Sequence, residues 1–230
     1  MKGTLYAIGV GPGDPDLITL KAANTIRQAD VIAIPQKKEE CRAYEIALKA
    51  IPEIKDKEIV DCAFSMVRDD ETRSALHKDI YEKIKEKLQN GRSVAFLTIG
   101  DPAIYSTFSY INELAKKDGI KCRMISGVTS ASACAAALGI DLCIGKEPLH
   151  IYPGTDSIEE AIKLPGTKVF MKGGKDIAAF KNLQDIDPEK KHVFAVSHCG
   201  AEDERCFKNI DELPDEAAYL TTVIIKEKNN

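Results

Sequence analysis

The sequence predicts an α/β fold made of two α/β domains. Short apolar runs alternate with longer amphipathic segments along the chain, and this alternation favours strands and helices in mostly parallel sheets. Several of the apolar runs end in glycine-containing turns, which are typical of strand-to-helix junctions in such folds. The chain has 230 residues, of which 44% are hydrophobic, so it can bury a sizeable core.

The first half of the chain contains five apolar runs that predict strands. They are residues 4–10, 30–35, 58–62, 93–99 and 121–126. Helical patterns are expected over residues 41–51, 69–90 and 105–117. A further helix is expected to begin at Pro15 with Asp14 as its N-cap, because apolar residues recur at helical spacing from Leu17 to Ile26.

The second half begins with a run of small residues between Gly127 and Asp141, which predicts a helix of little side-chain bulk. Four further strands are expected at residues 148–154, 167–174, 192–198 and 217–226. Gly119 follows the last helix of the first half, so the sequence predicts a domain boundary there. The two expected domains are residues 1–118 and 119–230.

Composition argues against several classes of partner. The net charge is −4, from 32 basic and 36 acidic residues, which disfavours a nucleic-acid partner. No segment approaches the roughly 20 apolar residues of a membrane helix, and the first residues resemble a strand more than a signal peptide. We therefore expect a cytoplasmic protein.

The seven cysteines form no C-x-x-C pair, and the histidines form no H-x₃-H motif. We therefore expect reduced thiols and no metal site.

The first glycine turn, Gly9-Val10-Gly11-Pro12-Gly13-Asp14, resembles a nucleotide-binding turn but lacks its phosphate-binding features. A phosphate requires free backbone N–H groups at the positive end of a helix. Pro12 removes one N–H group, and Asp14 and Asp16 add negative charge. The turn therefore suits a neutral or cationic ligand better than a pyrophosphate, although a plain strand-to-helix turn would have the same sequence.

A second turn, LTIGDPAIYST at residues 97–107, repeats the strand-to-glycine pattern at Gly100. Because ligands of open α/β sheets bind beyond the carboxyl ends of strands, the two turns are expected to face one site. Asp101 is a candidate site residue, and its alternative role is a helix N-cap beside Pro102. Tyr105 and the two residues after it supply hydroxyl groups.

Two further stretches have the same character. In ISGVTSASACAAALGI, residues 125–140, the small side chains would let a ligand lie against the backbone, or would allow close packing of helix on sheet. In VFMKGG, residues 169–174, Met171 stands at the end of an expected strand and is followed by two glycines.

Four stretches of the chain, in their order and spacing, resemble the tetrapyrrole (corrin/porphyrin) methyltransferase family. They are GVGPGDPDLITLKA, GDPAIYST, GVTSASACAAALGI and VFMKGG. The resemblance runs from about Thr4 to at least Gly200. FSMVRDDE and GDPAIYSTFSYI are most similar to the branch of the family that methylates carbon 20 of precorrin-2, or of its cobalt-containing counterpart cobalt-factor II, in cobalamin biosynthesis.

This resemblance implies two α/β domains with S-adenosylmethionine (SAM) in a cleft between them, and a homodimer. Because SAM carries a sulfonium cation and no phosphate, the implied cofactor agrees with the composition of the first turn. The residues that match the family's cofactor contacts are Pro12, Ile99, Gly100, Asp101, Ile104, Thr129, Ser130, Met171 and Gly200. Ile99 is a departure, since many relatives have glycine at this position.

The implied reaction is methylation of a ring carbon of a tetrapyrrole, with Asp101 and Tyr105 as candidate bases that remove the proton. The many carboxylates of such a substrate require basic residues, because arginine binds carboxylates in a bidentate manner. The candidates in segments that could flank the site are Lys37, Lys38, Arg42, Arg68 and Arg73.

Three alternatives to this function stay open. The substrate could be another tetrapyrrole position, as in uroporphyrinogen-III methylation. The same fold also serves methylation of ribosomal RNA or of a modified histidine, although the acidic balance disfavours RNA. A non-catalytic nucleotide-binding module is the third, and Pro12, Asp14 and the lack of a Walker lysine disfavour it.

Overall fold

The computed structural model describes residues 3–64, 69–181, 183 and 189–228, in two compact units: unit 1, Met1–Thr129, and unit 2, Ser130–Asn230. The division lies beyond the boundary at residues 118/119 that the sequence predicts. The reason is the strand β5 (Cys122–Ile125), which pairs in parallel with β1 (Leu5–Gly9) and so belongs to the first sheet. A glycine that ends a helix is therefore not the end of the domain here.

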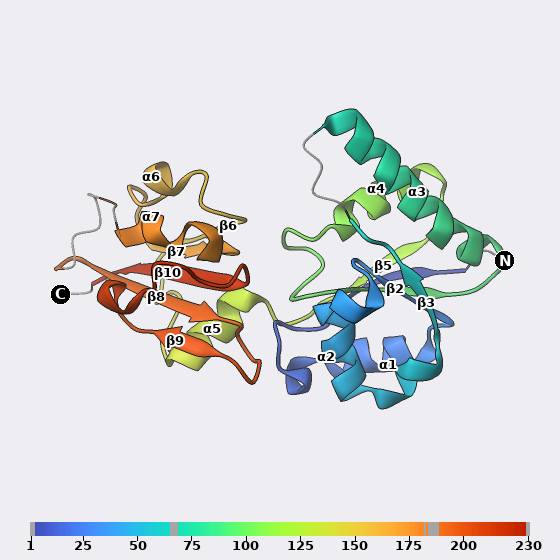
Figure 1. The fold of residues 1–230 in the computed structure, drawn as a ribbon, viewed down its shortest axis with the longest axis horizontal. Coiled ribbons are helices and arrows are strands. Elements are labelled where there is room, and N and C mark those ends of the chain that lie inside the picture. Colours follow the sequence, from blue (N-terminus) through green and yellow to red (C-terminus); the bar gives the residue numbers. More distant parts are fainter. Residues whose placement is uncertain (1–2, 65–68, 182, 184–188, 229–230) are drawn as a thin grey trace. The chain divides into compact units, whose positions relative to one another are not determined.

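Unit 1 contains one sheet of five strands in the order β3-β2-β4-β1-β5, and every pairing in it is parallel (Figure 1). This confirms the parallel α/β arrangement expected for this half of the chain. The other strands are β2 (Val31–Ile34), β3 (Glu58–Asp61) and β4 (Val94–Thr98).

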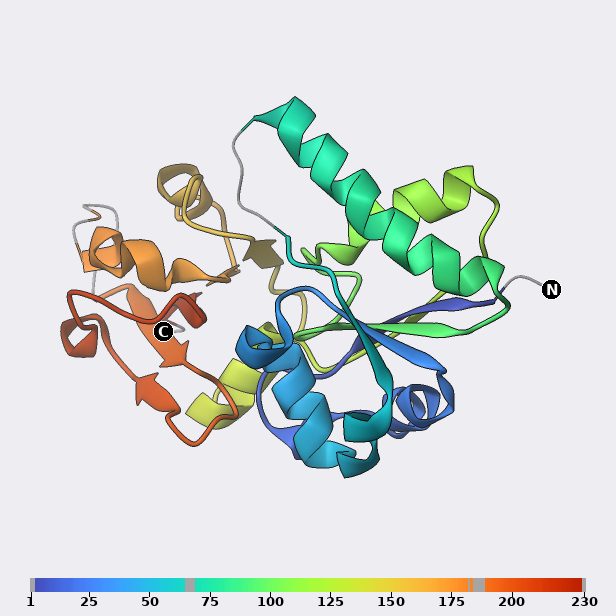
Figure 2. The same ribbon diagram turned by 45° about the vertical axis from the view of Figure 1, so that its right-hand side comes forward.

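Alternate residues of these strands pack on opposite faces of the sheet. On β4, Ala95 and Leu97 join the core that contains α1 and α2, whereas Val94 and Phe96 join the core that contains α3 and α4. Figure 2 shows the two pairs of helices on opposite sides of this sheet. The helices are α1 (Leu20–Gln28), α2 (Arg42–Ala50), α3 (Asp70–Gln89) and α4 (Phe108–Lys117). The period-two pattern thus gives a sheet that is buried on both faces.

The first helix begins later than the sequence predicts. Asp14 caps only the 3-10 turn Pro15–Leu17, where its Oδ1 accepts the N–H of Asp16 at 2.9 Å. The backbone is extended at Ile18, and Thr19 caps α1 by accepting the N–H of Ala22 at 3.2 Å. Two capping side chains compete in this segment, and the second one starts the α-helix. The remaining 3-10 turns of unit 1 are Lys38–Glu40 and Pro52–Asp56.

Unit 2 contains a mixed sheet in the order β6-β7-β10-β8-β9, so the expectation of mostly parallel sheets is wrong for this half. β6 and β7 pair in parallel, whereas β10 lies antiparallel between β7 and β8, and β9 pairs antiparallel with β8. The short link between β8 and β9 allows only a hairpin. The strands are β6 (Leu149–Tyr152), β7 (Thr167–Phe170), β8 (Lys191–Ser197), β9 (Arg205–Phe207) and β10 (Thr221–Glu227).

Helices cover both faces of the second sheet. On one face, buried residues of α6 (Ile158–Ala161) and α7 (Ile177–Lys181) belong to the same hydrophobic cluster as Phe170 and Val223. On the other face, α5 (Ser130–Leu138) contacts β8 and β10. The buried side chains of α5 are mainly alanines and Cys134, so its small residues allow close packing of the helix on the sheet. The 3-10 turns of unit 2 are Gly173–Asp176 and Ile210–Glu212.

Among the described residues, no helix has both the length and the apolar character needed to cross a membrane.

Candidate active site

Three loops leave the carboxyl edge of the unit-1 sheet side by side. They are the β1 loop (residues 10–14), the β4 loop (99–107) and the β5 loop (126–129), and β1 lies between β4 and β5 in the sheet. In open parallel sheets this edge is where ligands bind. The three loops contain all the cofactor and catalytic residues that the sequence predicts for this unit: Pro12, Ile99, Gly100, Asp101, Ile104, Tyr105 and Thr129. Ser130, the next residue, begins α5 in unit 2.

The backbones of three glycines lie in close contact where the three loops begin. A Cβ atom on Gly9 would overlap the carbonyl oxygen of Gly100 and lie 2.7 Å from the nitrogen of Gly127. A Cβ atom on Gly127 would overlap the same oxygen and lie 2.8 Å from the carbonyl carbon of Gly9. No L-residue with a side chain fits at either position without movement of the backbone. The contact of Gly9, Gly100 and Gly127 is called the glycine contact below.

The β1 and β4 loops are also joined by hydrogen bonds. The N–H of Gly100 donates to the oxygen of Gly11 at 2.8 Å, and the N–H of Gly11 donates to the oxygen of Gly100 at 3.4 Å. Gly100 has a φ of +71°, and a Cβ atom there would have only the oxygen of Val128 within 4 Å, at 3.9 Å. Gly100 therefore presents an open space that any side chain would enter.

Asp101 links the β4 loop to the β5 loop. Its Oδ1 accepts the N–H of Ala103 at 2.8 Å, and its Oδ2 accepts the N–H of Gly127 at 3.0 Å. Asp101 is thus not the N-cap of α4, which begins at Phe108. Instead, its carboxylate closes a local turn with one oxygen and holds the neighbouring loop with the other. Each of these oxygens keeps a lone pair for a further partner.

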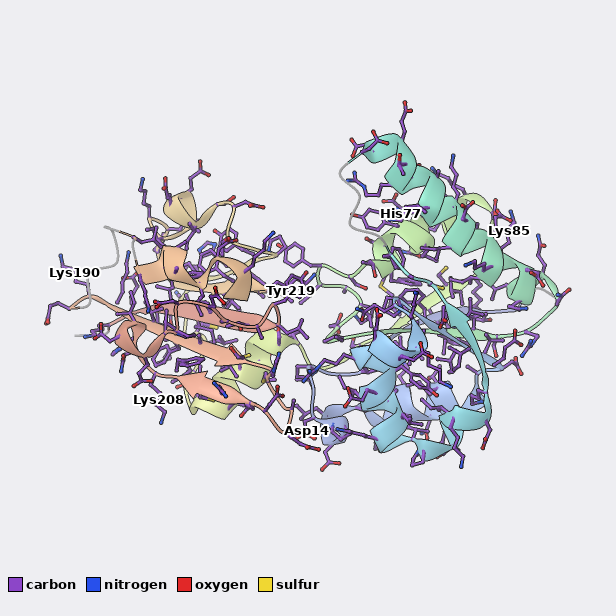
Figure 3. All side chains as sticks on the ribbon, in the orientation of Figure 1. Asp14, His77, Lys85, Lys190, Lys208 and Tyr219 are labelled. Atoms are coloured by element: carbon purple, nitrogen blue, oxygen red, sulfur yellow. The ribbon has the colours of Figure 1, made fainter. Side chains whose placement is uncertain are left out.

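Pro12 is buried in the β1 loop, and Asp14, at the end of that loop, is half-buried (Figure 3). The proline leaves this turn with one N–H group fewer than a phosphate-binding turn would offer. Acidic side chains follow it at the first 3-10 turn, where Asp14 accepts a backbone N–H with its own carboxylate. The geometry therefore agrees with a ligand that is not an anion.

Three of the predicted substrate-binding residues also lie at this edge. Lys37, Lys38 and Arg42 follow β2, which is parallel to β1 and β4 and ends at the same side of the sheet. Lys38 places its Nζ 5.3 Å from the centre of the Tyr44 ring. Arg73 lies in the first turns of α3, where it pairs with Asp70, and Arg68 lies outside the described residues.

Unit 2 places Met171 directly after β7 and Gly200 shortly after β8. The N–H of Met171 donates to the oxygen of Tyr152 at 2.9 Å, which continues the pairing with β6 beyond the end of β7. The N–H of Gly200 donates to Glu204 Oε2 at 2.7 Å. Both residues thus lie in ordered turns at strand ends.

The predicted site segments coincide with strained backbone. In the described part of the chain, three residues other than glycine have a φ in the left-handed region: Tyr105 at +48°, Lys172 at +57° and His198 at +50°. They follow β4, β7 and β8 respectively, each in a segment that the sequence singled out or that precedes Gly200. Such strain persists only where the surrounding structure imposes it, and it is common at functional sites.

Four features of these segments were not predicted from the sequence. They are the roles of Gly9 and Gly127 in the glycine contact, the bond between Thr98 Oγ1 and Ser106 Oγ at 3.0 Å, and the pairing of His198 Nδ1 with Asp203. The sequence does contain a pattern that could have indicated Gly9 and Gly127, because Gly-Val follows an isoleucine-containing strand in both AIGVG and ISGVT.

His77 and Cys199 lie in packed surroundings. His77, labelled on α3 in Figure 3, stacks on Tyr110 with ring centres 4.3 Å apart, and burial lowers its pKa. A hydrogen bond with Cys134, together with burial, raises the pKa of Cys199, so its thiol stays protonated. Within the described ranges, no group of three or more His, Cys, Asp or Glu side chains is arranged to hold a metal ion.

Comparison with known proteins gives one family. The profile of the family described as Tetrapyrrole (Corrin/Porphyrin) Methylases matches residues 4–214. A probable cobalt-precorrin-2 C(20)-methyltransferase of Methanocaldococcus jannaschii is 35% identical, over 96% of this chain and 95% of the relative. The cobalt-precorrin-2 C(20)-methyltransferase of Salmonella typhimurium is 26% identical, over 99% of this chain and 98% of the relative.

Solved structures show the same fold. A cobalt precorrin-4 methyltransferase superposes with a TM-score of 0.76 at 22% identity, over 97% of this chain and 94% of that protein. The uroporphyrin-III C-methyltransferase of Thermus thermophilus, solved in complex with S-adenosylhomocysteine, gives a TM-score of 0.73 at 20% identity, over 97% of both chains.

The glycine contact predicts a large effect of a single methyl group. We expect Gly9→Ala to lower the free energy of unfolding of unit 1 by about 1–3 kcal/mol or more, because its Cβ must displace two backbones. Gly154→Ala is the control, since a Cβ atom there would meet nothing within 4 Å and should leave stability unchanged or slightly higher. Hydrogen exchange of the β1 and β4 amides measures the effect, and equal protection in both variants would contradict the glycine contact.

Proposed function

We propose, because this chain belongs to the tetrapyrrole (corrin/porphyrin) methylase family, that it transfers a methyl group from SAM to carbon 20 of precorrin-2 or cobalt-factor II in cobalamin biosynthesis. The family match covers residues 4–214. The observation that carries the substrate proposal is the 35% identity, over nearly the whole of both chains, to a relative named as a probable cobalt-precorrin-2 C(20)-methyltransferase.

The geometry of the three loops supports SAM as the methyl donor. Gly100, with its left-handed backbone, leaves an open space at the end of β4, so a ligand can come into direct contact with the backbone there. The missing N–H of Pro12 and the acidic residues Asp14 and Asp16 disfavour a pyrophosphate and are compatible with a sulfonium cation. We place the amino-acid end and the sulfonium near Ile99, Gly100 and Asp101, with Pro12 and Ile104 beside them.

The start of α5 offers one further polar group. Among the described residues, Ser130 Oγ is a buried side-chain oxygen with no hydrogen-bond partner. A buried hydroxyl without a partner is costly, and a ligand can satisfy it. We therefore propose that Ser130, with the preceding Thr129, contacts the cofactor. In unit 2, Met171 and Gly200 are proposed as cofactor contacts from their positions in the family pattern and their ordered turns.

In the proposed reaction, carbon 20 of the macrocycle attacks the methyl carbon of SAM, the carbon–sulfur bond breaks, and S-adenosylhomocysteine leaves. A proton is then lost from carbon 20. The protein mainly aligns the two bound partners, and such alignment can contribute about 7–11 kcal/mol at most. Of the two candidate bases of the β4 loop, Asp101 and Tyr105, only Asp101 is proposed here as a proton acceptor. The two N–H bonds that Asp101 already accepts favour, for this residue, a role in loop order and charge balance.

The substrate's carboxylates are proposed to meet the basic residues at the same edge of the sheet. Lys37 and Lys38 are exposed and Arg42 is half-buried, all shortly after β2. Arg73 is half-buried on α3 and can exchange its Asp70 partner for a substrate carboxylate. Arg68 belongs to the same proposal. We also propose that the enzyme acts in the cytoplasm as a homodimer and without nucleic acid, which agrees with its net charge of −4.

The direct test of this function is a product analysis. We expect incubation with SAM and either precorrin-2 or cobalt-factor II to give a product heavier by one methyl group, located at carbon 20 by NMR with labelled SAM. Uroporphyrinogen-III is the control substrate and should stay unmethylated. Methylation of uroporphyrinogen-III alone would contradict the proposed position, and no transfer to any tetrapyrrole would contradict the function.

A matched pair of glycine variants tests the cofactor loop. Gly100→Val and Gly119→Val introduce the same side chain at positive φ, +71° and +65°, but only Gly100 lies in a proposed site. We expect Gly100→Val to weaken SAM binding by at least tenfold in calorimetry, because its side chain fills the open space. Gly119→Val should bind SAM normally at a similar loss of stability. Equal affinities in the two variants would show that Gly100 does not face SAM.

A charge-neutral variant tests Asp101. Asp101→Asn keeps one acceptor but turns an NH₂ group toward an N–H donor, so the link between the β4 and β5 loops is broken. We expect the affinities for SAM and S-adenosylhomocysteine to fall together by roughly tenfold. This factor corresponds to the typical free-energy cost of leaving one backbone N–H donor without a partner. The control is Asp30→Asn at the opposite edge of the same sheet. There Ser93 donates both of its bonds to one oxygen, Oδ2, so the amide oxygen of asparagine can accept both, and SAM affinity should stay unchanged.

Two other outcomes would assign Asp101 a different role. A loss of affinity for SAM but not for S-adenosylhomocysteine would indicate that the carboxylate balances the sulfonium charge. Unchanged affinities with turnover lower by about 10²–10⁴ would indicate a general base. Normal affinities and normal turnover would contradict every role proposed for this residue.

A further inference from the structure

Tyr105 combines an exposed aromatic ring with a backbone conformation that disfavours it. Its φ is +48°, in the left-handed region where glycine is favoured, and 49% of the residue is exposed. A bulky L-residue rarely adopts this conformation, because its Cβ crowds the neighbouring carbonyl. Glycine would occupy the position at lower cost, so the ring is held there against the preference of the backbone.

The residues on both sides of Tyr105 impose this conformation. Before it, Asp101 closes a turn through the N–H of Ala103 at 2.8 Å, and the N–H of Ile104 donates to the oxygen of Asp101 at 3.2 Å. After it, Ser106 Oγ bonds Thr98 Oγ1 at 3.0 Å and accepts the N–H of Phe108 at 3.2 Å. The β4 loop is therefore fixed at both ends of the ring-bearing residue.

Phe108 anchors the loop in the core. Its side chain is fully buried and packs on Phe96 of β4, with ring centres 5.5 Å apart. The exposed ring of Tyr105 is thus presented from a rigid support, and little conformational entropy is lost when it binds a partner. A rigid aromatic side chain at the carboxyl edge of a parallel sheet is well suited to contact a ligand.

We propose that Tyr105 is a positioning residue whose ring packs against the conjugated face of the tetrapyrrole substrate. The inference rests on the proposed function, which supplies a broad, flat and unsaturated substrate. Aromatic faces interact with such π-systems in offset-stacked or edge-to-face arrangements. The ring, and not the phenol hydroxyl, carries this role. Its effect is to hold the macrocycle in register with the methyl donor, and no proton passes through Tyr105.

The imposed conformation is tested first, by the melting temperatures of Tyr105→Gly and Tyr105→Ala. Both variants lack the ring, and only glycine relieves the left-handed backbone. We expect Tyr105→Gly to melt about 2–4 °C above Tyr105→Ala, the reverse of the usual order of these residues. If the alanine variant melts higher, the backbone at this position is not strained and does not hold the ring against its own preference.

The role of the ring is tested by kinetics with the tetrapyrrole substrate. We expect KM for the tetrapyrrole to rise about tenfold in Tyr105→Gly and Tyr105→Ala, with the dissociation constant of SAM unchanged. Tyr105→Phe keeps the ring and should behave like the wild type. Tyr110→Ala is the matched control, because Tyr110 is 45% exposed in the same unit but lies on α4, and its loss should leave KM unchanged.

Each contrary result has a distinct meaning. An unchanged KM in the glycine and alanine variants overturns the proposal, and so does an equal rise in Tyr110→Ala. A fall in turnover of about 10²–10⁴ in Tyr105→Phe would instead make the phenol a chemical participant. Weaker SAM binding would assign the ring to the cofactor. The wild-type product analysis separates these outcomes from failure of the proposed function, since only that failure abolishes tetrapyrrole methylation in the wild type.

Discussion

The meeting of three glycine backbones at the end of β1 is the constraint on which the candidate site depends. Gly9, Gly100 and Gly127 approach so closely that a Cβ on the first or the third would overlap the carbonyl oxygen of the second. This contact exists because β1 lies between β4 and β5 in a parallel sheet, so their loops leave the same edge together. Asp101 then ties the outer two loops with one carboxylate. The sheet thus builds a compact surface of backbone, with one open position at Gly100.

This surface explains why a turn that resembles a nucleotide-binding loop does not have to bind phosphate. A phosphate site needs several free N–H groups, whereas here the N–H of Gly100 is bonded to Gly11, that of Gly127 is bonded to Asp101, and Pro12 has none. What the edge offers is close approach, negative charge and one exposed aromatic ring. These properties suit a cationic methyl donor and a flat acceptor, as expected of the family to which the chain belongs.

The sequence predicts the parts of this structure that depend on local patterns. The apolar runs correctly predict the five parallel strands of unit 1, and the motif residues of unit 1 lie together on three adjacent loops. Features that depend on pairing between distant segments were not predicted. The antiparallel position of β10 between β7 and β8 has no local signal, and the place of β5 in the first sheet moved the division of the units beyond Gly119. Likewise, the left-handed backbone of Tyr105 results from the bonds of Asp101 and Ser106, which only the folded loop contains.

Hydrogen exchange of the wild-type protein tests directly whether the β1, β4 and β5 loops form one cofactor-binding surface. On addition of S-adenosylhomocysteine, we expect peptides covering residues 9–14, 98–107 and 126–131 to become protected together, at one ligand concentration, while the opposite edge around Asp30 and Ser93 is unchanged. Protection of only one of the three loops, or of none while the ligand binds, would contradict it.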